Sequence, residues 1–202
     1  MKFIFFDVGG VLIKDFSKTK KWEEMLTDLK IDLEKWSDLD EKYDKFEKEV
    51  AVGRNIEEFV PILVNEFGAV VIDNYSLNKD FVSRFEKNDV IWKIVNECRQ
   101  KYKVGLLTAQ YPNMLNLIKN VGLLLPINWD VVVDSSVVKV NKPNEEIYIL
   151  AQKEANVEPE EILFIDNIDK NLDVPKKLGW KTFLYDSSDY ERSNEELKAF
   201  LG

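Results

Sequence analysis

Short apolar runs rich in aromatic and β-branched residues recur along this chain, and segments of helical pattern separate the last four of them. The runs are Phe3–Phe6, Val104–Leu107, Asp130–Val133, Ile162–Ile165 and Lys181–Tyr185. Each has the length and composition of a buried strand. Strands that alternate with helices are joined by right-handed crossovers. The sequence therefore predicts an α/β fold: a Rossmann-like, parallel five-stranded sheet with helices on both faces.

Helical patterns with recognisable ends lie between and after the later runs. The segment Tyr111–Val121 has Pro112 near its start and Gly122 just past its end, the usual residues at those places. A second helix is expected over Pro143–Ala155. The last helix is expected to open at Ser193, because a glutamate three residues later completes the spacing of a capping box.

The region between the first two strands has a different pattern, with no convincing strand. Its apolar residues recur at spacings of three and four, as on one face of a helix. They are Leu33, Trp36, Leu39, Tyr43, Phe46 and Val50. Asn55 and Glu58 have the spacing of a capping box that opens another helix. We therefore expect residues 14–87 to form an inserted all-α subdomain, and residues 1–13 and 88–202 to form the α/β core domain.

The composition limits the chemistry that is open to the chain. It has 202 residues, a net charge of −9 and no histidine. Catalysis through a histidine base and zinc held by histidine are therefore excluded, which leaves carboxylates, hydroxyls, lysines and the backbone. The acidic balance argues against nucleic acid and acidic membranes as partners. The sequence has no signal peptide and no apolar run of transmembrane length, so we expect a cytoplasmic protein.

The first strand runs directly into an acidic residue and two glycines. Asp7 follows Phe3–Phe6, and Gly9 and Gly10 come two and three residues later. Glycine lets the backbone approach a bound group closely. Ligands of open α/β sheets bind at the carboxyl ends of the strands, where Asp7 is expected. Asp7 is therefore a candidate nucleophile or metal ligand, and the alternative interpretation is an ordinary turn aspartate.

Three later segments are expected to bring polar groups to the same edge of the sheet. Thr108 follows the second strand, Lys142 directly precedes a proline, and Asp166 with Asn167 follows the fourth strand. Together with Asp7 they supply two carboxylates, a hydroxyl and an ammonium. Oxygen ligands of this kind suit Mg²⁺, and a carboxylate can attack phosphorus. The set therefore fits phosphoryl transfer, with the metal shared by the two carboxylates.

These motifs resemble those of the haloacid dehalogenase (HAD) superfamily of hydrolases over essentially the full length. They are Asp7-Val8-Gly9-Gly10-Val11-Leu12, Leu106-Leu107-Thr108, Lys142-Pro143 and Phe164-Ile165-Asp166-Asn167. The helical insertion directly after the first motif is similar to the family's N-terminal type of cap. The resemblance implies that an aspartyl-phosphate forms on Asp7 and that the cap closes over the site and selects the substrate.

The resemblance also implies the remaining roles, the cofactor Mg²⁺ and a small phosphorylated metabolite as substrate. The expected catalytic residues are Asp7, Thr108 and Lys142. The expected substrate-binding residues are Gly9, Gly10, Thr108, Ala109 and Lys142. The expected metal ligands are Asp7, Gly9, Asp166 and Asn167.

Two positions depart from the family's pattern. The usual second aspartate, two residues after the nucleophile, protonates the leaving oxygen and then activates water. Gly9 stands there and offers a carbonyl to the metal but no proton. Such acid–base help is worth about 10²–10⁴-fold, so slow turnover or a preference for good leaving groups is expected. Asn167 replaces a frequent second acidic residue, and Asp169 is a candidate to compensate.

Three functions are therefore compatible with the sequence. The leading one is a Mg²⁺-dependent phosphatase. The second is a HAD-like binding or regulatory protein that has lost turnover, which Gly9 and Asn167 support. The third is metal-independent hydrolysis of a carbon–halogen bond by Asp7. Asp166 counts against the third, because a second carboxylate repels a carboxylate substrate.

Overall fold

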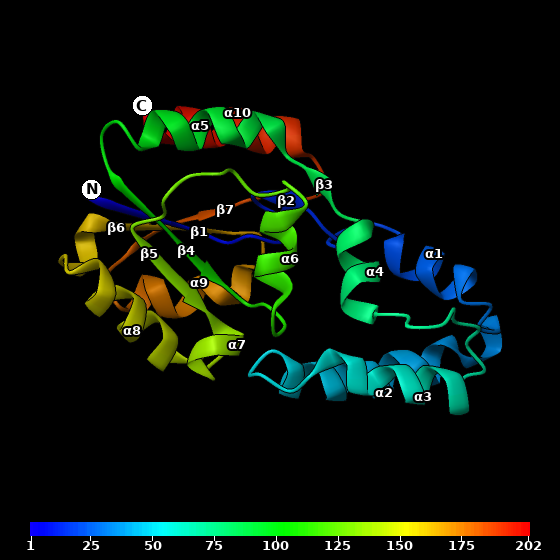
Figure 1. Cartoon of the computed structure of the whole chain (residues 1–202). Coiled ribbons are helices and arrows are strands. Elements are labelled where there is room, and N and C mark those ends of the chain that lie inside the picture. The colour runs from blue at the N-terminus through cyan, green and yellow to red at the C-terminus, as the bar shows by residue number, and fades with distance from the viewer.

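A five-stranded parallel sheet forms the centre of the molecule (Figure 1). The computed structural model describes residues 1–202, and its strands lie in the order β5-β4-β1-β6-β7 with every pair parallel. The strands are β1 Phe3–Phe6, β4 Lys103–Thr108, β5 Val131–Asp134, β6 Ile162–Asp166 and β7 Lys181–Leu184. Every residue of β1 and β6 is buried, as in parallel strands covered on both faces. The predicted fold class is confirmed.

Helices cover both faces of the sheet (Figure 1). Ile4 and Phe6 of β1 belong to a hydrophobic cluster with α5, α6 and α10, whereas Phe3 and Phe5 belong to a second cluster with α8 and α9. Alternate side chains of one strand thus supply the two cores. The helices of this domain are α5 Asp89–Cys98, α6 Met114–Asn120, α7 Ser135–Val138, α8 Glu145–Ala155, the 3-10 helix Pro159–Glu161, α9 Asp169–Lys177 and α10 Tyr190–Leu201.

Four further helices lie beside the sheet rather than over it, on the right of Figure 1. They are α1 Lys21–Asp28, α2 Trp36–Val50, α3 Val60–Asn65 and α4 Leu77–Ser83, with 3-10 helices Leu33–Lys35 and Ile56–Phe59 before α2 and α3. The chain enters this region through β2 Ile13–Lys14 and leaves it through β3 Glu86–Lys87. These two strands pair antiparallel. The ribbon was not predicted, because two residues are too few to show a strand pattern.

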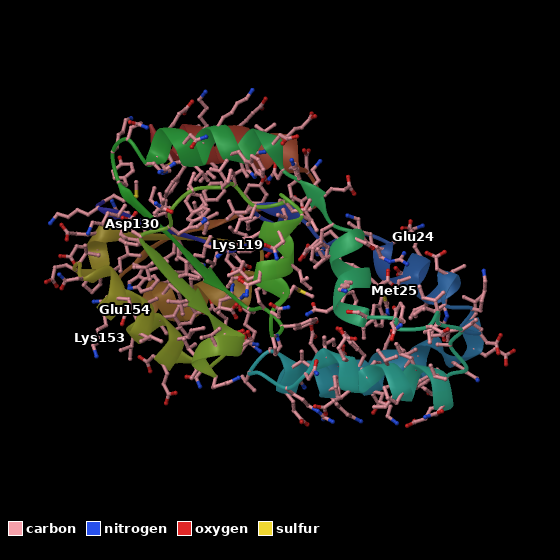
Figure 2. All side chains as sticks on the ribbon, in the orientation of Figure 1. Glu24, Met25, Lys119, Asp130, Lys153 and Glu154 are labelled. Carbon is pink, nitrogen blue, oxygen red and sulfur yellow. The ribbon has the colours of Figure 1, made fainter.

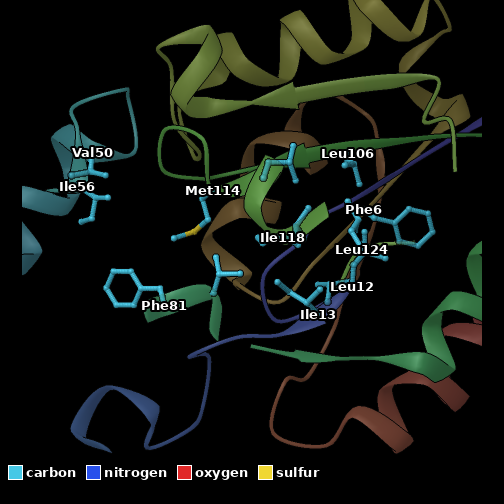
Figure 3. Close-up of a cluster of buried hydrophobic side chains, with 14 of the residues drawn as sticks. Phe6, Leu12, Ile13, Val50, Ile56, Phe81, Leu106, Met114, Ile118 and Leu124 are labelled. Atoms are coloured by element: carbon cyan, nitrogen blue, oxygen red, sulfur yellow. The ribbon is translucent and has the colours of Figure 1, made fainter. Parts of the chain in front are cut away.

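One continuous hydrophobic cluster joins the helical region to the sheet (Figure 3). Phe6 and Leu106 come from the sheet, Met114 from α6, Phe81 from α4, and Val50 from the end of α2. All five side chains are buried. Burial of apolar surface between the two regions stabilises their association.

The helices carry charge outward and apolar residues inward. In Figure 2 Glu24 extends from α1 into solvent, whereas the neighbouring Met25 is buried. Leu33 was expected on the apolar face of a helix but is 72% exposed. It lies in a 3-10 helix, whose three residues per turn carry it out of register with α2.

No helix is both long enough and apolar enough to cross a membrane.

Helices α6 and α8 begin a few residues later than expected, and the local backbone explains the difference. α6 begins at Met114, because Asn113 before it is in the left-handed conformation with φ of 67°. Tyr111 and Pro112 therefore lie outside the helix. α8 begins after Pro143, where Asn144 caps the helix by accepting a hydrogen bond from the amide of Glu146.

The last helix starts earlier than expected. It begins at Tyr190, and Asp189 caps it by accepting a hydrogen bond from the amide of Arg192. Ser193 lies within the helix and its hydroxyl donates to the carbonyl of Asp186. The expected cap at Ser193 was wrong, because aspartate is an equally good cap and comes first in the chain.

Candidate active site

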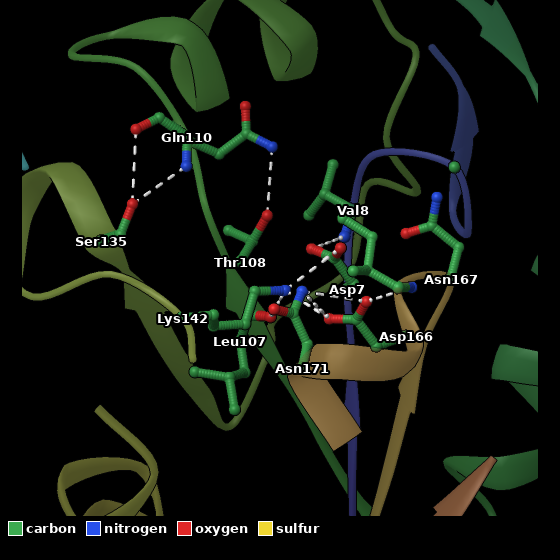
Figure 4. A network of polar contacts seen from close by, with 12 residues as sticks. Asp7, Val8, Leu107, Thr108, Gln110, Ser135, Lys142, Asp166, Asn167 and Asn171 are labelled. Atoms are coloured by element: carbon green, nitrogen blue, oxygen red, sulfur yellow. Dashed lines mark hydrogen bonds and ion pairs between the residues drawn. The ribbon is translucent and has the colours of Figure 1, made fainter. Parts of the chain in front are cut away.

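Polar side chains from distant parts of the chain meet at the carboxyl edge of the sheet (Figure 4). Asp7 directly follows β1, Thr108 ends β4 on one side of it, and Asp166 ends β6 on the other. Lys142 reaches the same place from the segment after α7. The carboxyl ends of parallel strands share one edge, so three neighbouring strands present three side chains together.

Lys142 is the centre of a buried ion triad. Its Nζ lies 3.1 Å from Asp7 Oδ2 and 2.6 Å from Asp166 Oδ2, and it donates to the carbonyl of Leu107 at 3.3 Å. All three charged side chains are buried. A buried charge is costly unless it is paired and hydrogen-bonded. The two carboxylates thus lie close together, as the sequence predicts, and the cation between them in the structure is the Lys142 ammonium.

Asp166 is held in place by its own backbone and by Asn171. The amide of Ile168 donates to Oδ1 at 2.8 Å, and Asn171 Nδ2 contacts Oδ1 at 3.2 Å and Oδ2 at 3.1 Å. Asn171 lies in the first turn of α9, so the helix that follows β6 clamps the strand's last residue. This carboxylate is preorganised with little freedom to turn.

The charges around Asp7 set its protonation. Burial raises the pKa of Asp7 to about 7, Lys142 opposes this, and Asp166 adds to it. The Thr108 hydroxyl and the Val8 amide, which donates to Asp7 Oδ1 at 2.7 Å, also lower the pKa. Burial alone lowers the pKa of Lys142, but Asp166 and Asp7 together raise it above its ordinary value. Lys142 is therefore an ammonium ion, and it could also bind an anionic ligand.

Gly10 has a structural reason to be glycine. Its φ is +72°, and a Cβ there would overlap the Asn167 amide and lie 2.8 Å from Ser187 Oγ. The Ser187 hydroxyl donates to the Gly10 carbonyl at 2.8 Å and accepts from Asn167 Nδ2 at 2.9 Å. Only glycine tolerates both this conformation and this contact. Gly10 therefore leaves the space that the Asn167 side chain occupies, and Ser187 contacts both residues.

Oxygen atoms at this edge could hold a hard cation. Asp7 and Asp166 supply carboxylates that meet at Lys142, and Gly9, which lines the cavity with Asp7, has a backbone carbonyl that could join them. Asn167 Oδ1 is buried and has no hydrogen-bond partner, a state that favours a cation or a water as its neighbour. No group of three or more acidic, histidine or cysteine side chains could hold a metal, so neutral oxygens would complete the set. Such a set fits Mg²⁺, which takes oxygen ligands and keeps several waters.

A cavity of about 720 Å³ opens above these residues. Its floor includes Asp7, Gly9, Lys142, Asn167 and Asn171. The helical region lines the rest of the cavity with residues that include Trp22, Tyr43, Glu47 and Phe81, and these four are here called the helical wall. This volume suits a small-molecule ligand.

Of the expected substrate-binding residues, Gly9, Ala109 and Lys142 line the cavity, and Gly10 and Thr108 do not. Thr108 is fully buried, and its hydroxyl accepts a hydrogen bond from Gln110 Nε2 at 3.0 Å. The backbone amide of Gln110 donates to Ser135 Oγ at 3.1 Å (Figure 4). Thr108 thus lies one layer below the cavity and contacts it through Gln110.

Tyr111 connects the helical wall to the sheet domain. Its hydroxyl donates to Glu47 Oε1 and lies 2.9 Å from the hydroxyl of Tyr43. Burial raises the pKa of Glu47, and the hydrogen bond from Tyr111 opposes this rise. A single chain of hydrogen bonds therefore runs from the loop after β4 to helix α2.

Sequence reasoning missed Asp15 and placed Asp169 among the candidates. Asp15 lines the cavity, and its Oδ1 accepts a hydrogen bond from the amide of Ser17 at 2.8 Å. Its only signal in the sequence is a carboxylate shortly after the first motif. Asp169 points elsewhere: it is exposed and pairs with Lys176 at 3.6 Å. Asp169 therefore does not compensate for Asn167.

Comparisons with known proteins agree with this architecture. The sequence model of the haloacid dehalogenase-like hydrolases matches residues 1–201. A HAD family enzyme of Bacteroides thetaiotaomicron, an aspartate-to-alanine mutant in complex with magnesium and inorganic phosphate, superposes with a TM-score of 0.75 at 20% identity, over 94% of this chain and 96% of that one. A HAD-like family hydrolase of Porphyromonas gingivalis gives a TM-score of 0.76 at 22% identity, over 100% and 98%.

Two further likenesses are weaker or partial. An L-2-haloacid dehalogenase of Xanthobacter autotrophicus, with chloropropionic acid covalently bound, gives a TM-score of 0.64 at 19% identity, over 92% of this chain and 77% of that one. Mouse acyl-CoA dehydrogenase family member 10 is 32% identical over 116 residues, which are 56% of this chain. The match covers 10% of that protein's length. At these identities the structural likenesses concern the fold alone.

The parallel sheet and the acidic residues at its carboxyl edge define an α/β protein with a polar site at the strand ends. With a match over nearly every residue, the chain belongs to the haloacid dehalogenase-like hydrolase family.

Proposed function

We propose that this protein is a phosphatase that acts on a small phosphorylated metabolite through Asp7. The observation that carries the proposal is the placement of Asp7 on the floor of the cavity, against an ammonium shared with Asp166. A carboxylate and a cation that line a cavity, with a second carboxylate buried behind the cation, are the parts of a phosphoryl-transfer site. The net charge of −9 favours a small substrate over nucleic acid.

We assign Mg²⁺ to the oxygens of Asp7, Gly9, Asp166 and Asn167. The unpartnered oxygen of Asn167 supports this assignment, and so does the magnesium in the Bacteroides enzyme of similar fold. When bound, the ion would lower the negative charge that the substrate meets at the two carboxylates. Because the amide is neutral, the site should bind Mg²⁺ less tightly than one with a further carboxylate.

The residues around Asp7 orient it for attack. The Val8 amide fixes Oδ1, and Oδ2 faces Lys142. In the first step a carboxylate oxygen of Asp7 forms a bond to phosphorus as the bond to the leaving oxygen breaks. In the second step water attacks the phosphorus of the aspartyl-phosphate and Asp7 leaves as a carboxylate. Lys142 would hold phosphoryl oxygens in both steps and stabilise their charge.

We further propose that residues 14–87 act as a cap on a core of residues 1–13 and 88–202. Both linkers pass through the β2–β3 ribbon, so the two connections move together. The helical wall faces the floor across the cavity. Closure of such a cap excludes water from the phosphoryl group and places cap side chains against the rest of the substrate.

One experiment separates this proposal from its alternatives. Wild type and Asp7→Asn are assayed for phosphate release from p-nitrophenyl phosphate, with Mg²⁺ and with EDTA. The proposal expects release by wild type with Mg²⁺ and loss of at least about 10⁴-fold in Asp7→Asn, as for other catalytic nucleophiles. Absence of release despite binding of phosphate would favour a binding protein. Halide release from 2-chloropropionate in EDTA would favour the dehalogenase, whose fold is also similar.

A further inference from the structure

The space beside Gly9 is filled by the carboxylate of another residue. A Cβ at position 9 would overlap Asp15 Oδ2 and lie 3.3 Å from Asp15 Cγ. Gly9 does not have a positive φ, so its backbone suits any residue. Asp15 is therefore the obstacle to a side chain at position 9. A carboxylate stands where the side chain of residue 9 would begin, although residue 9 carries none.

A tight turn brings Asp15 back over Gly9. The amides of Leu12 and Ile13 both donate to the carbonyl of Val8, at 2.9 and 3.1 Å, and Gly9 bridges to Ile13. The chain thus reverses within a few residues of the nucleophile. β2 follows at once, and Asp15 is the first residue after it. Backbone hydrogen bonds in the turn therefore fix the place of Asp15 in the chain relative to Gly9.

The two oxygens of Asp15 have different surroundings. Oδ1 accepts the hydrogen bond from the Ser17 amide at 2.8 Å, whereas Oδ2 is the oxygen nearest to the Gly9 position. Asp15 lines the cavity together with Asp7 and Lys142. The carboxylate is therefore anchored through Oδ1, and Oδ2 lies beside Gly9 in the cavity that contains Asp7.

We propose that Asp15 is the general acid and base of this enzyme, in place of the aspartate that the family carries two residues after the nucleophile. The proposal rests on the proposed phosphatase function. In the first step the Asp15 carboxylic acid gives its proton to the leaving oxygen as that oxygen's bond to phosphorus breaks and the Asp7–phosphorus bond forms. In the second step the Asp15 carboxylate takes a proton from the water that attacks phosphorus. Inorganic phosphate and the acid form of Asp15 result.

The first test concerns placement and needs no activity. Gly9→Ala should lower the melting temperature of the metal-free protein, because the new methyl group meets Asp15. In an Asp15→Ala background the same Gly9→Ala change should lower the melting temperature much less. An equal fall in melting temperature in both backgrounds would contradict the placement on which the proposal depends.

The second test uses leaving groups of different quality. Asp15→Asn is compared with wild type on p-nitrophenyl phosphate, whose leaving group needs no proton, and on glycerol 2-phosphate, whose leaving group does. We expect kcat/KM for glycerol 2-phosphate to fall by about 10²–10⁴-fold, the usual contribution of acid–base catalysis. With p-nitrophenyl phosphate we expect a burst of about one nitrophenol per enzyme and then slow turnover, because the second step has lost its base.

Two further variants complete the design. Asp38→Asn, an exposed aspartate on α2, is the matched control and should behave as wild type on both substrates. The double variant Gly9→Asp with Asp15→Ala places a carboxylate at position 9 in place of the one at position 15. It should have more activity on glycerol 2-phosphate than a variant that lacks both carboxylates.

The outcomes separate the two proposals. If Asp7→Asn is inactive but Asp15→Asn resembles Asp38→Asn, or loses activity equally on both substrates without a burst, the role of Asp15 is wrong and the phosphatase stands. If wild type releases no more phosphate than Asp7→Asn, the phosphatase proposal fails, and the role of Asp15 fails with it.

Discussion

Two sides of one cavity are built in different ways. At the floor, Asp7 follows β1 and Asp166 ends the neighbouring β6 just beneath it, and a backbone amide donates to one oxygen of each. On the helical wall, Trp22, Tyr43 and Phe81 come from three helices and pack ring against ring, with Trp22 and Tyr43 centroids 4.7 Å apart. The floor is held by short polar contacts at the strand ends, among them the ion pairs of Lys142 with Asp7 and Asp166. The wall depends on packing between helices, so it can vary without disturbing the chemistry below.

The largest effect is expected from removing the cation of the ion triad at the floor. Lys142→Met keeps an unbranched side chain, one atom shorter, but leaves Asp7 and Asp166 buried beside each other without their cation. We expect the free energy of unfolding, measured by urea denaturation at pH 8, to fall by about 3–5 kcal/mol. Lys153→Met, an exposed position on α8, should change it by less than about 0.5 kcal/mol. Similar values for the two variants would mean that the triad does not hold the floor together.

The next effect concerns the protonation of the floor. The pKa of Asp7 is about 7 when folded, against an ordinary value of 3.8, so the metal-free native state binds more protons than the unfolded state between these values. The contribution of Asp7 to the free energy of unfolding must therefore fall as pH rises through this window. Asp7→Asn removes the titrating group, and at pH 8 it should exceed wild type in unfolding free energy by up to about 4 kcal/mol. Near pH 4 the two proteins should be nearly equal.

The measurement is a series of urea titrations between pH 4 and pH 8 in EDTA. Asp38→Asn serves as the control, because its exposed carboxyl lies outside the site. A wild-type curve that rises from pH 5 to pH 8 relative to Asp7→Asn would contradict the pKa assigned to Asp7.

A smaller effect tests the connection between wall and floor. Tyr111→Phe removes the hydroxyl that contacts Glu47 and Tyr43 and leaves the half-buried Glu47 without this donor. We expect a loss of about 1–2 kcal/mol in unfolding free energy. Tyr102→Phe alters a half-buried tyrosine away from the cavity and should have little effect. If the two variants are equally stable, the wall is held by ring packing alone.

The same contrast explains how much the sequence could predict. Strands such as Phe3–Phe6 are buried on both faces, so they appear as unbroken apolar runs, and their ends locate Asp7 and Asp166. Parallel pairing then brings those ends together without further information. The floor of the site was therefore predictable from local pattern and one rule of topology.

The rest depended on features that local pattern does not carry. The start of α6 was set by a left-handed Asn113, and any of several polar residues could have supplied the cap of α10. Asp15 reaches the site because a tight turn at Val8 reverses the chain. The residues of the helical wall lie far apart in sequence, and only the angles between helices decide which of them face Asp7.

The most direct test of the account is to find the phosphoryl group on the enzyme. Wild-type protein is mixed with p-nitrophenyl phosphate and Mg²⁺, quenched in acid within one turnover, digested and examined by mass spectrometry. The account predicts a phosphoryl group on Asp7, absent from Asp7→Asn. Turnover with an unmodified Asp7, or a phosphoryl group on any other residue, would contradict it.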